Sequence, residues 1–376
     1  MIRSWSYIEE YLDFKKKILK SIDKTLKSGK IFFGKELNKF EKEFNNKYNF
    51  KYGLAVGSGT EAIYISLLSL GIGFGDEVIT VSNTAIPTVS AIRNTGADIK
   101  FVDIRDDYLI DTNKIEKNIS KKTKAIIPVH LYGKACNMEK IIKIAKKYKL
   151  KVIEDCAQAQ GAKFKNRYVG TFGDAGCFSF YPTKILGAYG DGGFISTNSF
   201  DLSQKIKRIR FYGIEQNNKK NRFNNKYYAM EYGINSRLDE IQSSILNIKL
   251  PKVNTWIKRR NKLAKIYYKE LLNTGLKLPK IEKECNHAFH LFVVYHRKRD
   301  NIIRMFKKNK ILVNINYPYP IHKMKGYNNI AGIKYKNLSI TEKLSKGIFS
   351  LPLYPKLEEK EVYRISKIIK KILKKI

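Results

Sequence analysis

Two residues stand where an acid and an amine could do chemistry together. Asp155 ends a short apolar run at residues 152–153, and Lys184 follows a second apolar run at 177–180, on a loop bounded by proline and glycine. Pyridoxal phosphate needs two such groups, a lysine amine that bonds to its aldehyde and a carboxylate that keeps its ring nitrogen protonated. The pattern therefore favours a pyridoxal phosphate site with Lys184 as the amine and Asp155 as the partner of the ring nitrogen.

A loop lysine alone is weak evidence, because Lys and Arg make up 73 of the 376 residues and most are expected to be solvated. Two longer motifs are more specific, EDCAQ at 154–158 and SFYPTKILGAYGDGG at 179–193. Both resemble motifs of the DegT/DnrJ/EryC1/StrS sugar aminotransferase family of fold-type I pyridoxal phosphate enzymes. The resemblance covers nearly the whole chain. It implies an aspartate aminotransferase-like α/β fold, pyridoxal 5'-phosphate alternating with pyridoxamine phosphate, and catalytic roles for Lys184 and Asp155.

The sequence GSGT at 57–60 follows a predicted strand at 54–56 and precedes a predicted helix. Ser58 and Glu61 fit an S-x-x-E capping box, which needs no ligand. The same helix start also presents free backbone N–H groups and the positive end of the helix dipole, which bind phosphate. The resemblance assigns the cofactor phosphate to three residues: Gly59, Thr60 and Ser179.

The stretch SNTAIPT at 82–88 departs from many family members, which place an aromatic side chain here against one face of the cofactor ring. The matching positions in this chain are Asn83, Thr84 and Ala85. The S-N-T-A-x-P-T form instead resembles the members that aminate carbon 3 of dTDP-3-keto-6-deoxyhexoses. On the opposite ring face the resemblance places Ala157, and it gives Gln158 a hydrogen bond to the ring oxygen.

Two further segments resemble family signatures. GINSRLDE at 233–240 matches a signature whose asparagine reaches the cofactor phosphate of the neighbouring subunit, which implies a homodimer with shared sites and this role for Asn235. YPYPIH at 317–322 resembles a segment that borders the sugar, so Tyr317 and His322 are possible substrate contacts, although turn chemistry alone accounts for the prolines. Charge alone suggests three partners for a substrate diphosphate: Lys219, Lys220 and Arg222.

Apolar strand-like runs alternate with helical periods along the first two thirds of the chain. This alternation predicts a mostly parallel sheet flanked by helices, in which ligands collect at the carboxyl ends of the strands. We expect a large pyridoxal phosphate-binding domain over residues 1–250 and a smaller α+β domain over 251–376. The smaller domain is expected to contain strands near 289–294 and 311–315.

The net charge of +39 raises nucleic acid or an anionic membrane as partners. The lysines are spread along the chain and no compact nucleic-acid-binding motif is visible, so we expect neither. The four cysteines lack metal-ligand spacing, so we expect reduced thiols and no metal, and His130 reads as a structural histidine. The first residues lack the apolar run of a signal peptide and no segment reaches transmembrane length, so we expect a cytoplasmic protein.

The combined prediction is an aminotransferase that moves an amino group from L-glutamate to the 3-keto carbon of a dTDP-3-keto-6-deoxyhexose, releasing 2-oxoglutarate. The product would be a dTDP-3-amino-3,6-dideoxyhexose for surface glycans such as lipopolysaccharide O-antigen. Dehydratase relatives carry histidine in place of Lys184, which argues against that branch. Two alternatives remain open: amination at carbon 4 of a UDP- or dTDP-4-keto-6-deoxyhexose, and a basic nucleic-acid-binding or regulatory protein on the same fold.

Overall fold

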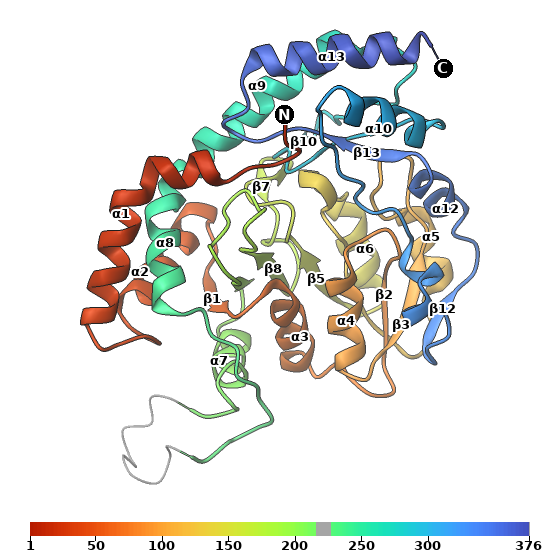
Figure 1. Cartoon of the computed structure of the whole chain (residues 1–376). Helices are drawn as coiled ribbons and strands as arrows, with labels where there is room; N and C mark the ends of the chain where they lie inside the picture. The colour runs from red at the N-terminus through yellow and green to blue at the C-terminus, as the bar shows by residue number, and fades with distance from the viewer. Residues whose placement is uncertain (216–226, 376) are drawn as a thin grey trace.

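The computed structural model describes residues 1–215 and 227–375 (Figure 1). Its centre is an eight-stranded sheet in the order β1-β9-β8-β5-β4-β2-β3-β12. Neighbours from β12 to β8 are parallel, whereas β9 is antiparallel to both β8 and β1. The predicted mostly parallel α/β sheet is therefore confirmed. The strands are β1 (Tyr52–Val56), β2 (Glu77–Val81), β3 (Asp98–Val102), β4 (Thr123–Ile126), β5 (Lys151–Asp155), β8 (Ala175–Ser179), β9 (Gly193–Thr197) and β12 (Ile333–Tyr335).

Helices cover both faces of this sheet because successive strand residues point to opposite sides. In β5, Val152 joins one apolar cluster and Ile153 joins the other. The Val152 cluster includes helices α1 (Ile8–Lys27), α2 (Lys35–Tyr48), α5 (Thr112–Ile115), α6 (Met138–Lys147) and α8 (Glu240–Lys249). The Ile153 cluster includes α3 (Gly59–Ser69), α4 (Ile86–Asn94) and α7 (Phe200–Ile209).

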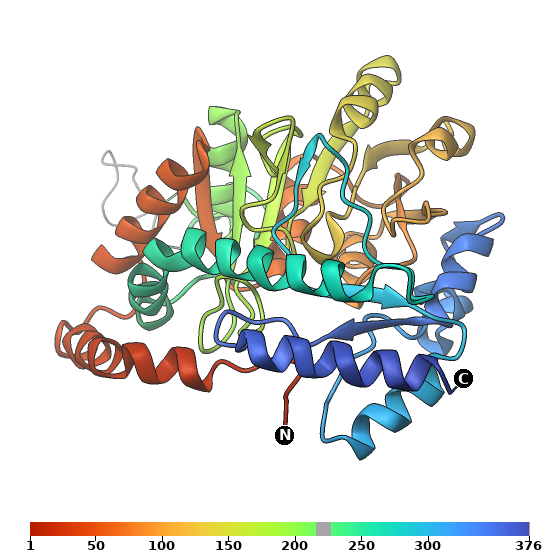
Figure 2. The same cartoon turned by 90° about the horizontal axis from the view of Figure 1, so that it is seen from above.

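The C-terminal part builds a third apolar cluster. Helices α9 and α13 lie side by side across it (Figure 2). Its elements are α9 (Val253–Leu271), β11 (Phe292–Tyr295), α10 (Arg299–Lys308), β13 (Ile348–Leu351) and α13 (Glu359–Leu373). The shorter remaining elements are β6 (Lys163–Phe164), β7 (Arg167–Tyr168), β10 (Cys285–Asn286), α11 (Lys325–Asn328) and α12 (Ser339–Ser345).

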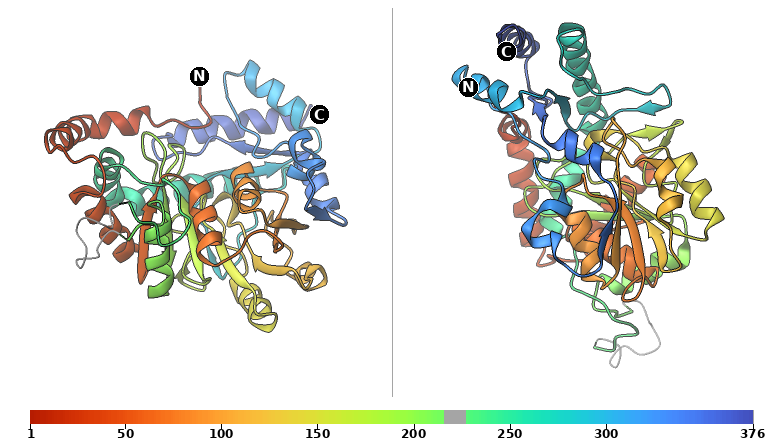
Figure 3. Two further views of the ribbon diagram at one scale, coloured as in Figure 1. Left: turned by 90° about the horizontal axis from the view of Figure 1, so that it is seen from below. Right: turned by 90° about the vertical axis from the view of Figure 1, so that its right-hand side faces the viewer.

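The N-terminal and C-terminal parts of the chain each contribute a segment to the other. Ile2 is buried in the C-terminal cluster, and β12, from the C-terminal part, pairs in parallel with β3 at the edge of the large sheet (Figure 3). The division of the chain into 1–250 and 251–376 stays a prediction. None of the described helices is both long enough and apolar enough to cross a bilayer.

Two strand predictions in the C-terminal part need correction. The strand expected at 289–294 begins only at Phe292, because Phe289 has a φ of 48°, in the left-handed region that a strand cannot use. Residues 311–315 form isolated bridges instead of a strand. Ile311 pairs with Ile2 and Asn314 with Ser350, so no single neighbour runs alongside long enough to form a ladder.

Candidate active site

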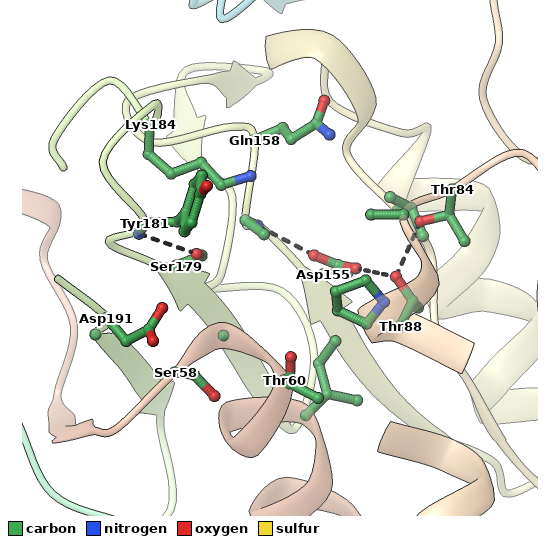
Figure 4. Close-up of a pocket in the computed structure, with 17 residues that line it drawn as sticks. Ser58, Thr60, Thr84, Thr88, Asp155, Gln158, Ser179, Tyr181, Lys184 and Asp191 are labelled. Carbon is green, nitrogen blue, oxygen red and sulfur yellow. Dashed lines mark hydrogen bonds between the residues drawn. The ribbon is translucent and has the colours of Figure 1, made fainter. Parts of the chain in front are cut away.

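A cavity of about 330 Å³ lies where β5 and β8 end and where α3 and α4 begin (Figure 4). This is the edge of a parallel sheet at which ligands are expected. Its described lining contains seven of the residues that were predicted to bind the cofactor: Gly59, Thr60, Asp155, Ala157, Gln158, Ser179 and Lys184. The structure therefore brings together residues that lie more than a hundred positions apart in the sequence.

The start of α3 forms one wall of the cavity. Ser58 caps the helix, its Oγ accepting a hydrogen bond of 3.1 Å from the N–H of Glu61. The reciprocal half of the predicted capping box is absent, because the Glu61 carboxylate accepts from Ser236 Oγ instead. No hydrogen bond between described residues uses the N–H groups of Gly59 and Thr60. These two donors are available to an anion at the positive end of the helix.

Asp155 forms the floor of the cavity at the end of β5. It is buried, and its Oδ1 accepts from the N–H of Ala157 at 3.1 Å while its Oδ2 accepts from Thr88 Oγ1 at 2.7 Å. Burial raises the pKa of Asp155, and the hydrogen bonds from Thr88 and Ala157 together with the charge of Lys184 oppose that rise. The bonded donors and the facing cation thus support a carboxylate that the apolar surroundings disfavour.

Lys184 extends into the cavity from the loop after β8 (Figure 4). No hydrogen bond between described residues engages its Nζ, and burial lowers its pKa to about 8, with the charge of Asp155 acting in the opposite direction. A lysine in this state is a far better nucleophile at neutral pH than an exposed one.

The loop that carries Lys184 is fixed by two buried side chains. Gln160 donates to the carbonyl oxygens of Ser179 (2.8 Å) and Leu186 (3.1 Å) and accepts from the N–H of Leu186 (2.6 Å). Lys249 donates to the carbonyl of Gly187 and pairs with Glu10 of α1 at 2.6 Å. The catalytic geometry is therefore supported from the core and does not depend on the loop alone.

Comparison with known proteins decides the family. The model of the DegT/DnrJ/EryC1/StrS aminotransferase family matches residues 13–370. The chain belongs to this family. It is 40% identical over 376 residues, covering 98% of each chain, to the dTDP-3-amino-3,4,6-trideoxy-alpha-D-glucose transaminase of Micromonospora megalomicea subsp. nigra. It is 39% identical over 94% of each chain to the dTDP-3-amino-3,6-dideoxy-alpha-D-galactopyranose transaminase of Aneurinibacillus thermoaerophilus.

Solved structures of family relatives agree with this assignment. DesV of S. venezuelae, crystallised in complex with a ketimine intermediate, superposes with a TM-score of 0.93 and 32% identity, covering 99% of this chain and 98% of its own. NtdA of Bacillus subtilis, crystallised with bound cofactor PMP, gives a TM-score of 0.87 and 33% identity, covering 96% of this chain and 82% of its own. The predicted fold class, aminotransferase activity and pyridoxal phosphate cofactor are therefore confirmed.

The described cavity fits the family cofactor. The N–H groups of Gly59 and Thr60 at the start of α3, which no described residue uses, fit a phosphate. A Cβ on Gly59 would lie only 2.7 Å from the Cβ of Ser179, so this close approach of α3 and β8 requires glycine. Asp155 and Ala157 both line this cavity, where they were predicted to contact the ring nitrogen and one ring face. When bound, the cofactor supplies an aldehyde and an electron-withdrawing ring. The individual contacts remain proposals.

Gln158 connects this site to the C-terminal part of the chain. Its Oε1 accepts from the N–H of Tyr132 at 3.0 Å and its Nε2 donates to the hydroxyl of Tyr317 at 2.8 Å. The amide orientation is fixed by these two bonds, which leaves one Nε2 hydrogen for the predicted bond to the cofactor. Tyr317, predicted as a substrate contact, thus adjoins the cavity through Gln158.

Several predicted site residues lie elsewhere. His322 is fully buried between Ser82 Oγ (2.7 Å) and Glu342 (3.0 Å) and is outside the described cavity lining. Asn235 is exposed and also outside that lining, next to Ser236, which holds the turn before α3. The proposed diphosphate partners Lys219, Lys220 and Arg222 lie outside the described residues.

His130 lies behind the cavity in a fully bonded network. Its Nδ1 accepts from the N–H of Cys136 at 3.0 Å, so its Nε2–H donates to Glu154 at 3.0 Å. Glu154 also accepts the N–H groups of Gly170, Phe172 and Gly173. Glu154, His130 and Cys156 are close enough to hold a metal ion, but these bonds already use the histidine nitrogens and the carboxylate.

Three cavity residues stand inside the motifs described above but were not predicted as site residues. Thr88, Tyr181 and Asp191 line the described cavity together with the predicted residues. Thr88 is the most informative of them, because it bonds directly to Asp155. Its signals in the sequence were its place at the end of the SNTAIPT stretch and in the first turn of a helix that follows a strand of the parallel sheet.

Gly59→Ala is expected to lower the affinity of the apo-protein for pyridoxal phosphate by about tenfold, because the added methyl overlaps the Ser179 side chain and overpacking of this kind costs about 1–3 kcal/mol. The matched control is Gly326→Ala, where a Cβ meets nothing within 4 Å. Titration of each apo-protein with the cofactor, followed by absorbance, measures the effect. Equal affinities of the two variants for pyridoxal phosphate would contradict the assignment of the start of α3 to the cofactor phosphate.

The rate at which pyridoxal phosphate attaches to the apo-protein is expected to rise with pH and to level off above about pH 8, because burial holds the Lys184 pKa at about 8. Only the neutral amine reacts, and below that pKa its fraction grows about tenfold per pH unit. Stopped-flow absorbance measures the rate, and dividing it by the rate with Nα-acetyl-lysine removes the titration of the cofactor itself. Because the free ε-amine titrates at about pH 10.4, this ratio is expected to be constant below about pH 8 and to fall above it. A ratio that stayed constant up to pH 10 would show an ordinary lysine.

Proposed function

We propose that the protein transfers the amino group of L-glutamate to carbon 3 of a dTDP-3-keto-6-deoxyhexose. The product is a dTDP-3-amino-3,6-dideoxyhexose, which supplies surface glycan synthesis such as that of O-antigen. The observation that carries the proposal is the shared cavity of Lys184, Asp155 and the SNTAIPT stretch, represented in the lining by Thr84, Ala85 and Thr88. Two relatives at 40% and 39% identity are named for dTDP sugars aminated at position 3, which supports the same position here.

The residues of the chain divide the work of the reaction. With the cofactor bound, the Lys184 amine would hold its aldehyde and would be released when the amine of glutamate takes that place. The freed Lys184 amine would then be the general base that accepts the proton of the glutamate α-carbon and the acid that returns it. Asp155 would keep the ring nitrogen charged, so that the ring can stabilise the negative charge that develops when this proton leaves. The same groups act in the reverse order on the keto sugar, after 2-oxoglutarate has left.

The proposal includes a homodimer with shared sites. Asn235 is exposed and does not line the described cavity of its own chain, which fits a role at the phosphate of a neighbouring subunit. The four cysteines are free and buried, as is usual for proteins of the reducing cytoplasm. We therefore place the reaction there, with no nucleic acid among its substrates.

A single-turnover experiment tests the substrate. The holoprotein is first converted with glutamate to its pyridoxamine form, and a keto sugar nucleotide is then added while the pyridoxal absorbance is followed. Return of that absorbance with a dTDP-3-keto-6-deoxyhexose alone is the expected result. Return with only a 4-keto sugar nucleotide would assign carbon 4. Return with neither, together with DNA binding that weakens steeply with salt, would favour a regulatory role on this fold.

A further inference from the structure

Two threonine hydroxyls connect Asp155 to the entrance of α4. Thr88 Oγ1 lies 2.7 Å from Asp155 Oδ2, and Thr84 Oγ1 lies 2.9 Å from Thr88 Oγ1 (Figure 4). Both threonines are at least 98% buried, and both line the cavity. The three side chains thus form a continuous polar row, with Ile63, Pro87 and Val129 among the apolar residues of the same described lining.

The number of hydrogens fixes the direction of this row. Each threonine hydroxyl has one hydrogen to donate. Asp155 as a carboxylate can only accept, so Thr88 gives its hydrogen to Asp155. Thr84 must then donate its own hydrogen to Thr88. The two hydroxyl dipoles point the same way, with their positive ends toward the carboxylate, and such chains polarise one another.

The orientation of Thr88 differs from the usual behaviour of a hydroxyl side chain inside a helix. Such a side chain commonly bonds to a backbone carbonyl one turn earlier, as Ser66 does with Ala62 at 2.7 Å in α3. The hydrogen of Thr88 is instead directed out of α4 to the end of β5. The Thr88 hydroxyl in the first turn of α4 therefore bonds to Asp155 and not to a backbone carbonyl of its own helix.

We propose that Thr84 and Thr88 form a two-hydroxyl relay that keeps the Asp155 carboxylate charged opposite the cofactor ring nitrogen. They are positioning residues, since they act through Asp155, and the proposal rests on the proposed role of that residue. The relay is needed because the carboxylate is desolvated. A hydrogen bond to a charged group is among the strongest that a neutral side chain can offer.

Thr88 shares the stabilisation of Asp155 with the Ala157 N–H, which donates to the other carboxylate oxygen at 3.1 Å. Burial opposes the charged form, and the charge of Lys184 favours it. His130 lies behind Asp155 and contributes no charge, because its Nδ1 accepts from the N–H of Cys136. Tyr317 and Cys177 are also near, and burial together with the charge of Asp155 raises their pKa values, so both stay neutral. When Lys184 is bonded to the cofactor, the charge on its nitrogen depends on the cofactor and no longer on Lys184 alone. Loss of the Thr88 donor would then move the shared proton from the ring nitrogen toward the carboxylate.

The test is the 15N resonance of holoprotein loaded with ring-15N pyridoxal phosphate, compared between wild type and Thr88→Val. Wild type is expected to show a protonated ring nitrogen. T88V is expected to shift the resonance toward the neutral value and to lower kcat for the glutamate half-reaction by about tenfold or more. Thr88→Ser should restore both, and Thr84→Val should shift the resonance in the same direction by a smaller amount.

A matched control separates the relay from packing. Thr80→Val removes another buried threonine hydroxyl, one that donates to the carbonyl of Ile127 at 2.9 Å, and it should leave the resonance unchanged. An unshifted resonance in T88V overturns the relay. If T88V does not retain the cofactor, T84V decides in the same way. A neutral ring nitrogen in wild type would overturn the role of Asp155 itself, and the relay with it.

Discussion

Lys184→Ala is expected to lower the rate of amino transfer by about 10³-fold or more. In the proposed mechanism Lys184 is both the amine that bonds to the cofactor and the group that moves the proton between donor and cofactor carbons, and general acid–base catalysis alone contributes about 10²–10⁴-fold. The surrounding wall does not depend on the lysine, because no hydrogen bond between described residues uses its Nζ. The variant should therefore fold and still hold the cofactor phosphate.

The rate of the glutamate half-reaction, followed by absorbance in a single turnover, measures this effect. Lys165→Ala is the control, because it removes an exposed lysine that pairs with Glu139, and it should react at the wild-type rate. A K184A variant that retained more than a tenth of the wild-type rate would show that another group moves the proton.

Asp155→Asn is expected to lower the same rate by about 10²–10³-fold, the range typical for loss of a charge that stabilises a developing opposite charge. Asparagine keeps the size of the side chain and can still bond to Thr88 and Ala157, but it cannot hold the ring nitrogen protonated. The loss should appear in kcat more than in the affinity for glutamate, because the charge is needed when the proton leaves the α-carbon.

Single-turnover rates of the half-reaction over a range of glutamate concentrations, with Asp106→Asn as control, distinguish this effect from a general change of charge. Asp106 is half exposed and pairs with Lys280 at 2.6 Å. It is not among the residues that line the described cavity. A D155N variant within threefold of wild type would contradict the assigned partner of the ring nitrogen.

Much of this site could be predicted from the sequence because its residues follow strands. Asp155 and Lys184 come directly after apolar runs, and parallel strands bring their carboxyl ends to one edge. The turn before α3 carried its own signal, since a helix start that is rich in glycine and serine suggests a phosphate site. The family motifs around both residues made the chemistry specific.

Other features could not be predicted, because they depend on contacts distant in sequence. His322 was expected near the sugar, but its bonds to Ser82 and Glu342 bury it. The Glu61 carboxylate looked like half of a capping box, yet it is bonded to Ser236, 175 residues away. Thr88 stands in the SNTAIPT stretch, but its bond to Asp155 depends on how the first turn of α4 faces the end of β5.

We propose that Lys184 is the residue to which pyridoxal phosphate bonds. Reduction of the holoprotein with borohydride makes that bond permanent, and mass spectrometry of the digested protein then locates the cofactor. The added mass is expected on the peptide that contains Lys184, and it should be absent there in K184A. Cofactor attached at a different lysine, or spread over many of them, would contradict the assignment of Lys184.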